Sequence, residues 1–268
     1  MIKNTTQLKK RIHFFGVDID SLNMSETVNE IKKWLNAPEK NCKFVITPNV
    51  DHIVKVQTDI GLQAAYQQAA LVVTDGKPVV WAAKLLGVDI TSTVPGSDLV
   101  PAIFDDAQIN HTTIKVFLLG AMPGVADRAK VAIEAKWPMI TVVGTLSPDF
   151  GFDKNVAISK AICATVNASG ADLLVLGLGA PKQELWVTQY AADISVKVAL
   201  CVGATIDFLA GEKARAPIWM RKVGLEWLHR MMSEPKRLAK RYMVDAIVFP
   251  KLILNEWLLR RFNTQKER

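Results

Sequence analysis

The chain has 268 residues, 50% of them apolar, which suits one large α/β domain or one domain with an appendage. Its three cysteines lie far apart, so we expect no disulfide framework, and no Cys/His spacing is typical of a zinc site. No apolar run approaches the ~20 residues that span a bilayer, and the basic N-terminal segment has too short an apolar stretch for a signal peptide, so we expect a cytoplasmic protein.

Residues 13–210 alternate between short β-branched runs and amphipathic stretches. In chain order we predict strands at 13–19, 43–47, 71–74, 115–119, 140–144, 172–177 and 197–201. The helices that we predict between them span 25–36, 50–68, 78–86, 97–108, 123–136, 153–168 and 181–191. Several strands are unbroken apolar runs, which is typical of strands covered by helices on both faces. The alternation predicts an α/β fold with a doubly wound, mostly parallel sheet.

After about Ala210 the strand signals stop, and the chain becomes helical, basic and rich in Trp, Leu and Met. We predict an α/β domain at 1–212 and a basic helical C-terminal appendage at 213–268. Within the appendage, Ser233 is expected to cap a helix whose first turn holds Pro235.

The formal net charge of +7 belongs to the appendage. Residues 212–268 contain 14 Lys/Arg and 6 Asp/Glu, a net of +8 that leaves −1 for the other 211 residues. This asymmetry indicates an anionic partner: phosphates, an anionic membrane face or nucleic acid.

Ligands of an open α/β sheet bind beyond the carboxyl ends of the strands, so the loops after the strands are the candidate sites. Thr47 and Asn49 follow one strand, where they either cap the next helix or contact a ligand. Asp75 follows another strand and precedes Gly76, so it is either a turn residue or a general base.

A glycine pair, Gly177 and Gly179, follows a third strand, with Gln183 in the first turn of the next helix. Two glycines let the backbone approach a ligand closely, and the N-terminus of a helix favours phosphate. The third glycine of a dinucleotide fingerprint is missing, which counts against a nucleotide-dependent oxidoreductase.

Asp18 and Asp20 form a D-x-D at the end of the first predicted strand. Such a pair either ends a strand before a turn or holds a divalent ion in a metal-dependent glycosyltransferase. Two carboxylates alone do not specify a metal site.

The appendage contains Arg230, Arg237 and Arg241, whose spacing of 7 and 4 would bring them near one face if they shared a single helix, which Pro235 interrupts; Lys240 lies beside them. They form either a phosphate-binding set or a solvated charged face. Residues 247–262 then combine Trp, Phe and Leu with Lys and Arg, which suits either a helix on an anionic membrane surface or one packed on its own domain.

These segments together resemble the WecG/TagA/CpsF glycosyltransferase family over nearly the whole chain. The matching pieces are TPNVDH at 47–52, TDGKPV at 74–79, PGSDL at 95–99, FLLGAMPGVADRA at 117–129, LLVLGLGAPKQE at 173–184, VGATIDFLAG at 202–211, RAPIWMRKVGLEWLHR at 215–230 and EPKRLAKRY at 234–242. Their order and spacing are more specific than any single motif.

The resemblance implies an inverting transfer, without a metal or cofactor, from a UDP-activated amino sugar to undecaprenyl-diphosphate-N-acetylglucosamine, on the inner face of the bacterial membrane. It makes Asp75 the candidate base. The same resemblance makes Thr47, Asn49 and Gln183 active-site contacts.

It also implies that the appendage supplies cations to the site and helps the protein to bind the membrane. Those positions fall on Arg230, Arg237 and Lys240, with Arg241 adjacent.

Two positions depart from the family pattern: Lys240 and Thr93 stand where an arginine is usual. The donor sugar therefore stays open among N-acetylmannosamine, its uronic acid, glucose or another sugar. A homo-oligomer is possible, whereas no nucleic-acid recognition motif accompanies the basic charge.

Overall fold

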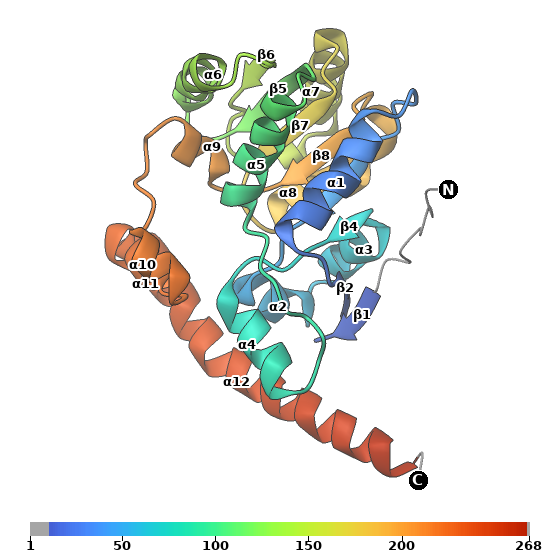
Figure 1. Cartoon of the computed structure of the whole chain (residues 1–268), viewed down its shortest axis with the longest axis vertical. Coiled ribbons are helices and arrows are strands. Elements are labelled where there is room, and N and C mark those ends of the chain that lie inside the picture. Colours follow the sequence, from blue (N-terminus) through green and yellow to red (C-terminus); the bar gives the residue numbers. More distant parts are fainter. Residues whose placement is uncertain (1–10, 267–268) are drawn as a thin grey trace.

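A computed structural model of the chain describes residues 11–266, so most of the N-terminal segment considered for a signal peptide lies outside the described residues. Six parallel strands form the central sheet (Figure 1). Their spatial order is β4 (Leu71–Val72), β3 (Lys43–Ile46), β8 (Val198–Cys201), β7 (Leu173–Gly177), β5 (Ile114–Gly120) and β6 (Ile140–Leu146). The predicted α/β fold with a parallel sheet is confirmed.

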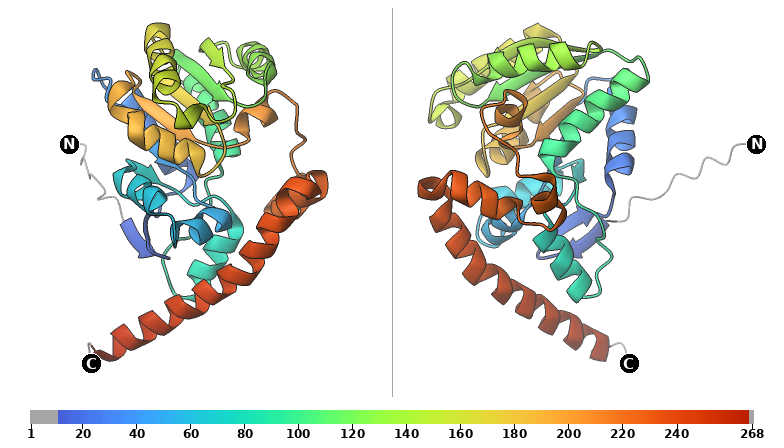
Figure 2. Two further views of the ribbon diagram at one scale, coloured as in Figure 1. Left: turned by 180° about the vertical axis from the view of Figure 1, so that it is seen from behind. Right: turned by 60° about the vertical axis from the view of Figure 1, so that its left-hand side comes forward.

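Helices cover both faces of this sheet (Figure 2). One face packs against α1 (Met24–Leu35), α5 (Gly96–Ile109), α6 (Val125–Lys136) and α9 (Thr205–Leu209). The other packs against α2 (Val50–Val56), α3 (Ile60–Gln68), α4 (Lys77–Leu85), α7 (Val156–Ser169) and α8 (Lys182–Tyr190). Two short 3-10 helices span Phe152–Lys154 and Ala191–Asp193. Leu173 and Val175 belong to the first core layer and Leu174 and Leu176 to the second, which explains the unbroken apolar run.

The single strand predicted at 13–19 is wrong. The segment is a hairpin of β1 (Arg11–Phe14) and β2 (Val17–Asp20), which pair antiparallel in a separate two-stranded sheet. The chain reverses at Phe15 and Gly16, whose φ angles are 53° and 78°. A glycine tolerates this left-handed region, whereas a phenylalanine there is uncommon, so the apolar run gave little sign of the turn.

The single helix predicted at 50–68 is also interrupted. α2 ends at Val56 and α3 begins at Ile60, with Asp59 as the N-cap whose carboxylate accepts a hydrogen bond of 2.9 Å from the Leu62 amide. The apolar pattern continues across the break, because both helices face the same core layer. The local capping interaction therefore sets the boundary.

The chain after α9 is helical and forms α10 (Ile218–Lys222), α11 (Glu226–Ser233) and α12 (Pro235–Lys266). Ser233 is not the expected cap, because it is the last residue of α11 and its hydroxyl donates to the carbonyl of His229. α12 crosses beside α2 and α4 at one end of the molecule (Figure 1). Its Phe249 ring lies 5.4 Å from that of Phe15, so the hairpin anchors the helix. The division into two domains stays a prediction.

Candidate active site

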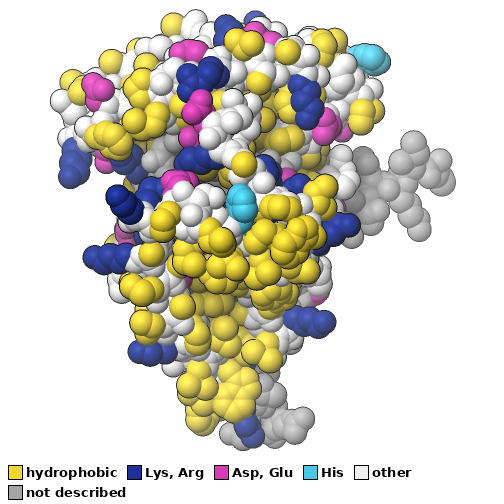
Figure 3. Space-filling model, turned by 90° about the vertical axis from the view of Figure 1, so that its left-hand side faces the viewer, with side chains coloured by type: hydrophobic (Ala, Val, Ile, Leu, Met, Phe, Trp, Pro, Cys, Tyr) yellow, Lys and Arg dark blue, Asp and Glu magenta, His cyan; other side chains and the backbone are white. Residues whose placement is uncertain are grey.

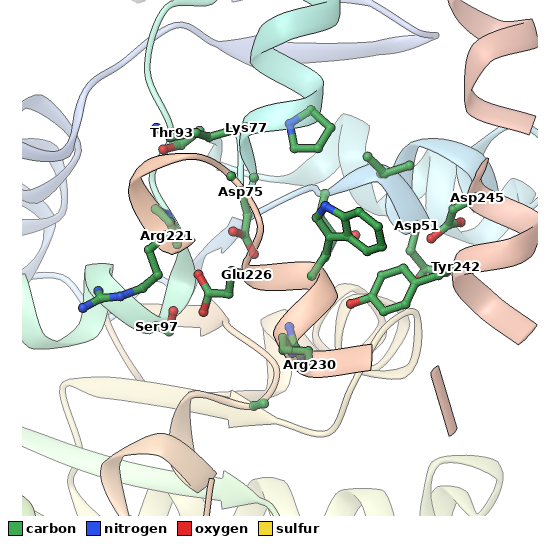
Figure 4. A pocket seen from close by; sticks show the side chains of 18 of the residues that line it. Asp51, Asp75, Lys77, Thr93, Ser97, Arg221, Glu226, Arg230, Tyr242 and Asp245 are labelled. Atoms are coloured by element: carbon green, nitrogen blue, oxygen red, sulfur yellow. The ribbon is translucent and has the colours of Figure 1, made fainter. Parts of the chain in front are cut away.

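A cavity of about 560 Å³ lies where the carboxyl edge of the sheet meets the C-terminal helices. The core lines it with the loops after β3 and β4 and with the start of α5. The turn before α11, α11 itself and α12 supply the opposite wall. Figure 4 labels ten of its residues: Asp51, Asp75, Lys77, Thr93, Ser97, Arg221, Glu226, Arg230, Tyr242 and Asp245. The carboxylate at the sheet edge and the basic helices therefore share one site.

The backbone holds Asp75 rigidly at this edge. Its amide donates to the Pro48 carbonyl at 2.7 Å, which ties the β4 loop to the β3 loop. The next residue, Gly76, has φ 103° and opens α4, so the chain turns away sharply and leaves the Asp75 carboxylate in the cavity (Figure 4). Asp75 is thus both the residue before the turn at Gly76 and a carboxylate that faces the cavity.

The surroundings of Asp75 favour its protonated form. Burial raises the pKa of the carboxyl from its ordinary value of 3.8 to about 7, although the nearby Arg230 opposes this rise. The carboxylates of Glu226 and Asp98 raise the pKa further by repulsion, and Arg215 lowers it. A carboxyl group with a pKa near 7 can accept and release a proton at neutral pH, which is what a general base requires.

An ion-pair network holds the C-terminal helices over this end of the cavity. Arg215 Nη2 lies 3.0 Å from Asp98 Oδ1, and its Nε lies 3.4 Å from Glu226 Oε1. Arg221 reaches the same Asp98 carboxylate at 3.6 Å. Asp98 is in the first turn of α5, so the network connects the core to both α10 and α11.

Only two of the four cations predicted in the appendage line the cavity, Arg230 and Arg241. Among the described residues, no carboxylate lies within 4 Å of the Arg230 guanidinium. Arg241 Nη1 lies 3.7 Å from Asp51 Oδ2, and its guanidinium stacks 5.1 Å from the centre of the Tyr242 ring.

Arg237 and Lys240 are not among the residues that line the cavity. Arg237 pairs instead with Glu234 at 2.6 Å, and Lys240 is exposed. Glu234 separates α11 from α12, so the four cations do not share one helix and the predicted common face is wrong.

Of the predicted loop residues, Asn49 lines the cavity and also caps α2 by accepting from the His52 amide. Thr47 lies beneath, where its hydroxyl donates to the Cys201 carbonyl at 3.1 Å. Gln183 is buried and joins α8 to the loop after β8, because its Oε1 accepts from the Gly203 amide, while its Nε2 donates to the neighbouring Glu184. Neither Thr47 nor Gln183 is among the lining residues.

The glycine pair lies outside the lining too. A Cβ on Gly177 would approach the Ile206 side chain to 2.8 Å, so this glycine permits close packing of β7 on α9. Gly179 has φ 80° with open space where a Cβ would lie, which leaves its backbone accessible.

The family model described as "Glycosyl transferase WecG/TagA/CpsF family" matches residues 12–263. The chain belongs to this family. It is therefore a glycosyltransferase.

Similar proteins include two from Staphylococcus aureus, strains MRSA252 and MW2. Each is named "N-acetylglucosaminyldiphosphoundecaprenol N-acetyl-beta-D-mannosaminyltransferase" and is 28% identical over 242 residues, which cover 89% of this chain and 91% of the relative.

In this glycosyltransferase, the side chains of the D-x-D aspartates bind residues of the β1–β2 hairpin and of β4. Asp18 pairs with His13 at 2.9 Å on the surface, and the buried Asp20 accepts from Arg11 at 3.1 Å and from the Val72 amide at 2.8 Å. Neither residue lines the cavity, and the described residues contain no cluster of three or more potential metal ligands.

Several cavity residues had no clear signal in the sequence. Glu226 is an acidic residue in a basic segment, which is the one hint that it has a specific partner. Asp245 is buried with its Oδ2 unbonded within the described structure, and burial raises its pKa to about 6. Its place on α12 opposite Asp51 depends on how that helix docks, which sequence spacing does not reveal.

The outer side of α12 carries an apolar stripe. Met243, Ile247, Leu254 and Leu258 are spaced by 4, 7 and 4 residues and fall on one face of the helix, each of them exposed. Figure 3 shows hydrophobic side chains gathered on this side of the molecule, with Lys and Arg around them. None of the helices in the described part of the chain has the length and apolar character needed to cross a membrane.

Proposed function

We propose that this glycosyltransferase moves N-acetylmannosamine from a UDP donor to undecaprenyl-diphosphate-linked N-acetylglucosamine, in the synthesis of a bacterial surface polysaccharide. The transfer would be inverting and would need no metal or cofactor. The observation that carries the proposal is that Asp75 and the Arg230 guanidinium line one cavity in a chain of this family. The names of the relatives supply the transferred sugar and the lipid-linked acceptor of the proposal.

In the proposed reaction, the acceptor hydroxyl attacks the anomeric carbon of the donor while Asp75 takes its proton. The bond from that carbon to the UDP oxygen breaks, and UDP leaves with both electrons of the bond. Arg230 and Arg241 would neutralise the developing charge on the diphosphate. Because one displacement occurs, an α-linked donor would give a β-linked product.

The charges around Asp75 favour a neutral donor sugar. Asp98 and Glu226 add two carboxylates to this end of the cavity, and Thr93 occupies the position where the family often has an arginine. Arg215 and Arg221 pair with these two carboxylates, but the additional carboxylate of a uronic acid would lack the cation that the family often has at position 93. N-acetylmannosamine is therefore preferred to its uronic acid, and UDP-glucose is the second candidate.

Mass spectrometry of the product formed from a panel of UDP-sugars, each with the same lipid acceptor, tests the donor. Asp75→Asn should lower transfer by at least ~100-fold, whereas Asp149→Asn, an exposed aspartate outside the cavity, should leave it unchanged. Near-normal turnover of Asp75→Asn would remove this residue from the role of base. Full activity in chelator would support the proposal that no metal is needed.

We further propose that the protein lies on the anionic inner face of the membrane through the stripe on α12. The stripe is flanked by Lys240, Lys251 and Arg261, which suits anionic lipid headgroups. A chain that ends at residue 212 should no longer sediment with anionic vesicles and should lose transfer. Unchanged sedimentation would show that the C-terminal helices are not the membrane contact.

A further inference from the structure

One wall of the cavity is aromatic and takes no part in the chemistry proposed above. It is formed by Trp81 of α4, by Trp227 of α11 and by Tyr242 and Phe249 of α12. The rings of Trp227 and Tyr242 meet edge to face at 5.7 Å between their centres. These side chains offer flat apolar ring surface, and their polar groups are limited to the indole N–H of each Trp and the Tyr242 hydroxyl.

Two of these rings also reach the outer surface. Trp81 is 50% exposed and Trp227 is 39% exposed, although both line the cavity. They therefore stand at its mouth, between the interior and the surroundings.

Outside this mouth the apolar surface continues on two elements. Leu85, one turn beyond Trp81 on α4, is 74% exposed, and Ile218 and Trp219 of α10 are each 62% exposed. Exposed lysines accompany them on the same helices, Lys84 on α4 and Lys222 on α10. An apolar surface with lysines beside it matches a bilayer with anionic headgroups.

α4 and the C-terminal helices are packed together as one unit at this point. Gly224 has φ 72°, and a Cβ on it would lie 2.7 Å from the Trp81 ring. Lys77 Nζ also donates a hydrogen bond to the Lys222 carbonyl. The mouth of the cavity is thus built jointly by the core domain and the appendage.

We propose that the first isoprene units of the acceptor lipid leave the cavity between Trp81 and Trp227 and reach the bilayer along α4 and α10. This inference rests on the proposed function, because it takes the polyprenyl-diphosphate acceptor as given. With the acceptor hydroxyl at Asp75 and its diphosphate near Arg230, the lipid chain needs an apolar exit, and the aromatic wall supplies one that opens on the lysine-flanked surface. α4 therefore belongs to the acceptor site and to the membrane-facing surface.

A direct test uses binding rather than turnover. A polyprenyl diphosphate with a diazirine in its second isoprene unit, in vesicles that contain anionic lipid, is irradiated with the full-length protein. Mass spectrometry should find the label on residues 78–85 and 219–227. Label found only beyond residue 250, or none on α4 and α10–α11, would overturn the inference.

A kinetic test compares two acceptors, one with a long polyprenyl chain in vesicles and one with a ten-carbon prenyl chain in buffer. Trp81→Ala should raise KM for the long-chain acceptor about 10-fold and leave KM for the UDP-sugar unchanged. Leu85→Ser, which leaves the Gly224 contact intact, should raise the long-chain KM by a smaller factor. Val131→Ser is the matched control for Leu85→Ser, because Val131 on α6 is 70% exposed and Leu85 is 74% exposed.

No loss with either acceptor for Trp81→Ala, or equal losses with both acceptors for Leu85→Ser, would contradict the exit past Trp81 and along α4. The proposed function fails separately, if the unmodified protein turns over neither acceptor. In that event the photolabelling result still decides whether a polyprenyl diphosphate occupies the mouth.

Discussion

Replacing Asp75 by asparagine should make the protein more stable at alkaline pH. In the folded protein, burial raises the pKa of Asp75 from 3.8 to about 7. Above pH 7 the folded chain must hold an ionised carboxylate that is more easily accommodated in the unfolded chain, and this destabilises the fold. Asparagine has nearly the same shape and no charge, so the penalty disappears.

The size of the effect follows from the shift. A difference of about 3 pH units corresponds to roughly 4 kcal/mol of unfolding free energy at pH 8, as an upper limit. Because the folded pKa is the higher one, the penalty is complete above pH 7, shrinks as the pH falls and vanishes near 3.8. At pH 5 the variant should therefore be more stable by no more than about 2 kcal/mol.

Urea unfolding of the wild type and of Asp75→Asn at pH 8, 6 and 5 measures this directly. Asp149→Asn serves as the control, because its carboxylate is exposed and its replacement should change stability by less than about 0.5 kcal/mol at every pH. The reasoning is refuted if Asp75→Asn unfolds at the same urea concentration as the wild type at pH 8. It is equally refuted if the gain in stability is the same at pH 5 and pH 8.

Three further predictions follow from the same geometry. Transfer at subsaturating substrate should rise with pH up to about 7, because Asp75 loses its proton over this range. Glu226→Gln should move this rise to lower pH, because it removes a negative charge that raises the pKa of Asp75. A profile of the transfer rate from pH 5.5 to 9 measures both effects. Arg230→Ala should lower kcat/KM about 100-fold, with Arg230→Lys partly active, while Arg237→Ala, outside the cavity, should stay within about 3-fold of the wild type. Gly120→Ala should reduce the free energy of unfolding by more than about 3 kcal/mol, because Gly120 has φ 124° and the added Cβ would lie 2.5 Å from the Gly177 backbone. Gly151→Ala is the control, because Gly151 also has a positive φ but open space around it, and it should cost only about 1 kcal/mol. Thermal unfolding of both variants measures the difference.

The sheet was predictable from the sequence because its strands are local apolar runs whose two faces are both covered. The position of Asp75 was predictable for a related reason: the carboxyl ends of parallel strands meet at one edge, so the loop after β4, which contains Asp75, had to lie beside the loop after β3. The hydrogen bond from the Asp75 amide to Pro48 is the direct result of that arrangement.

The arrangement of the appendage was less predictable. Spacing suggested one face for Arg230, Arg237 and Arg241, but the break at Glu234 restarts the helix and turns Arg237 outward. Which residues of α12 face the core depends on contacts with α2 and with the hairpin at Phe15, both far away in the sequence. Hydrophobic periodicity reports a helix and its apolar faces, and it does not say which of two apolar faces is covered.

The cavity explains why one chain combines an α/β core with a basic helical end. The core supplies a carboxylate and a rigid loop, whereas α11 supplies Arg230, which lowers the raised pKa of Asp75, and Glu226, which raises it further. The cations that would neutralise a leaving diphosphate come from the same helices. Docking of α11 and α12 against the core therefore brings the carboxylate of Asp75 and the cations of the site into one cavity.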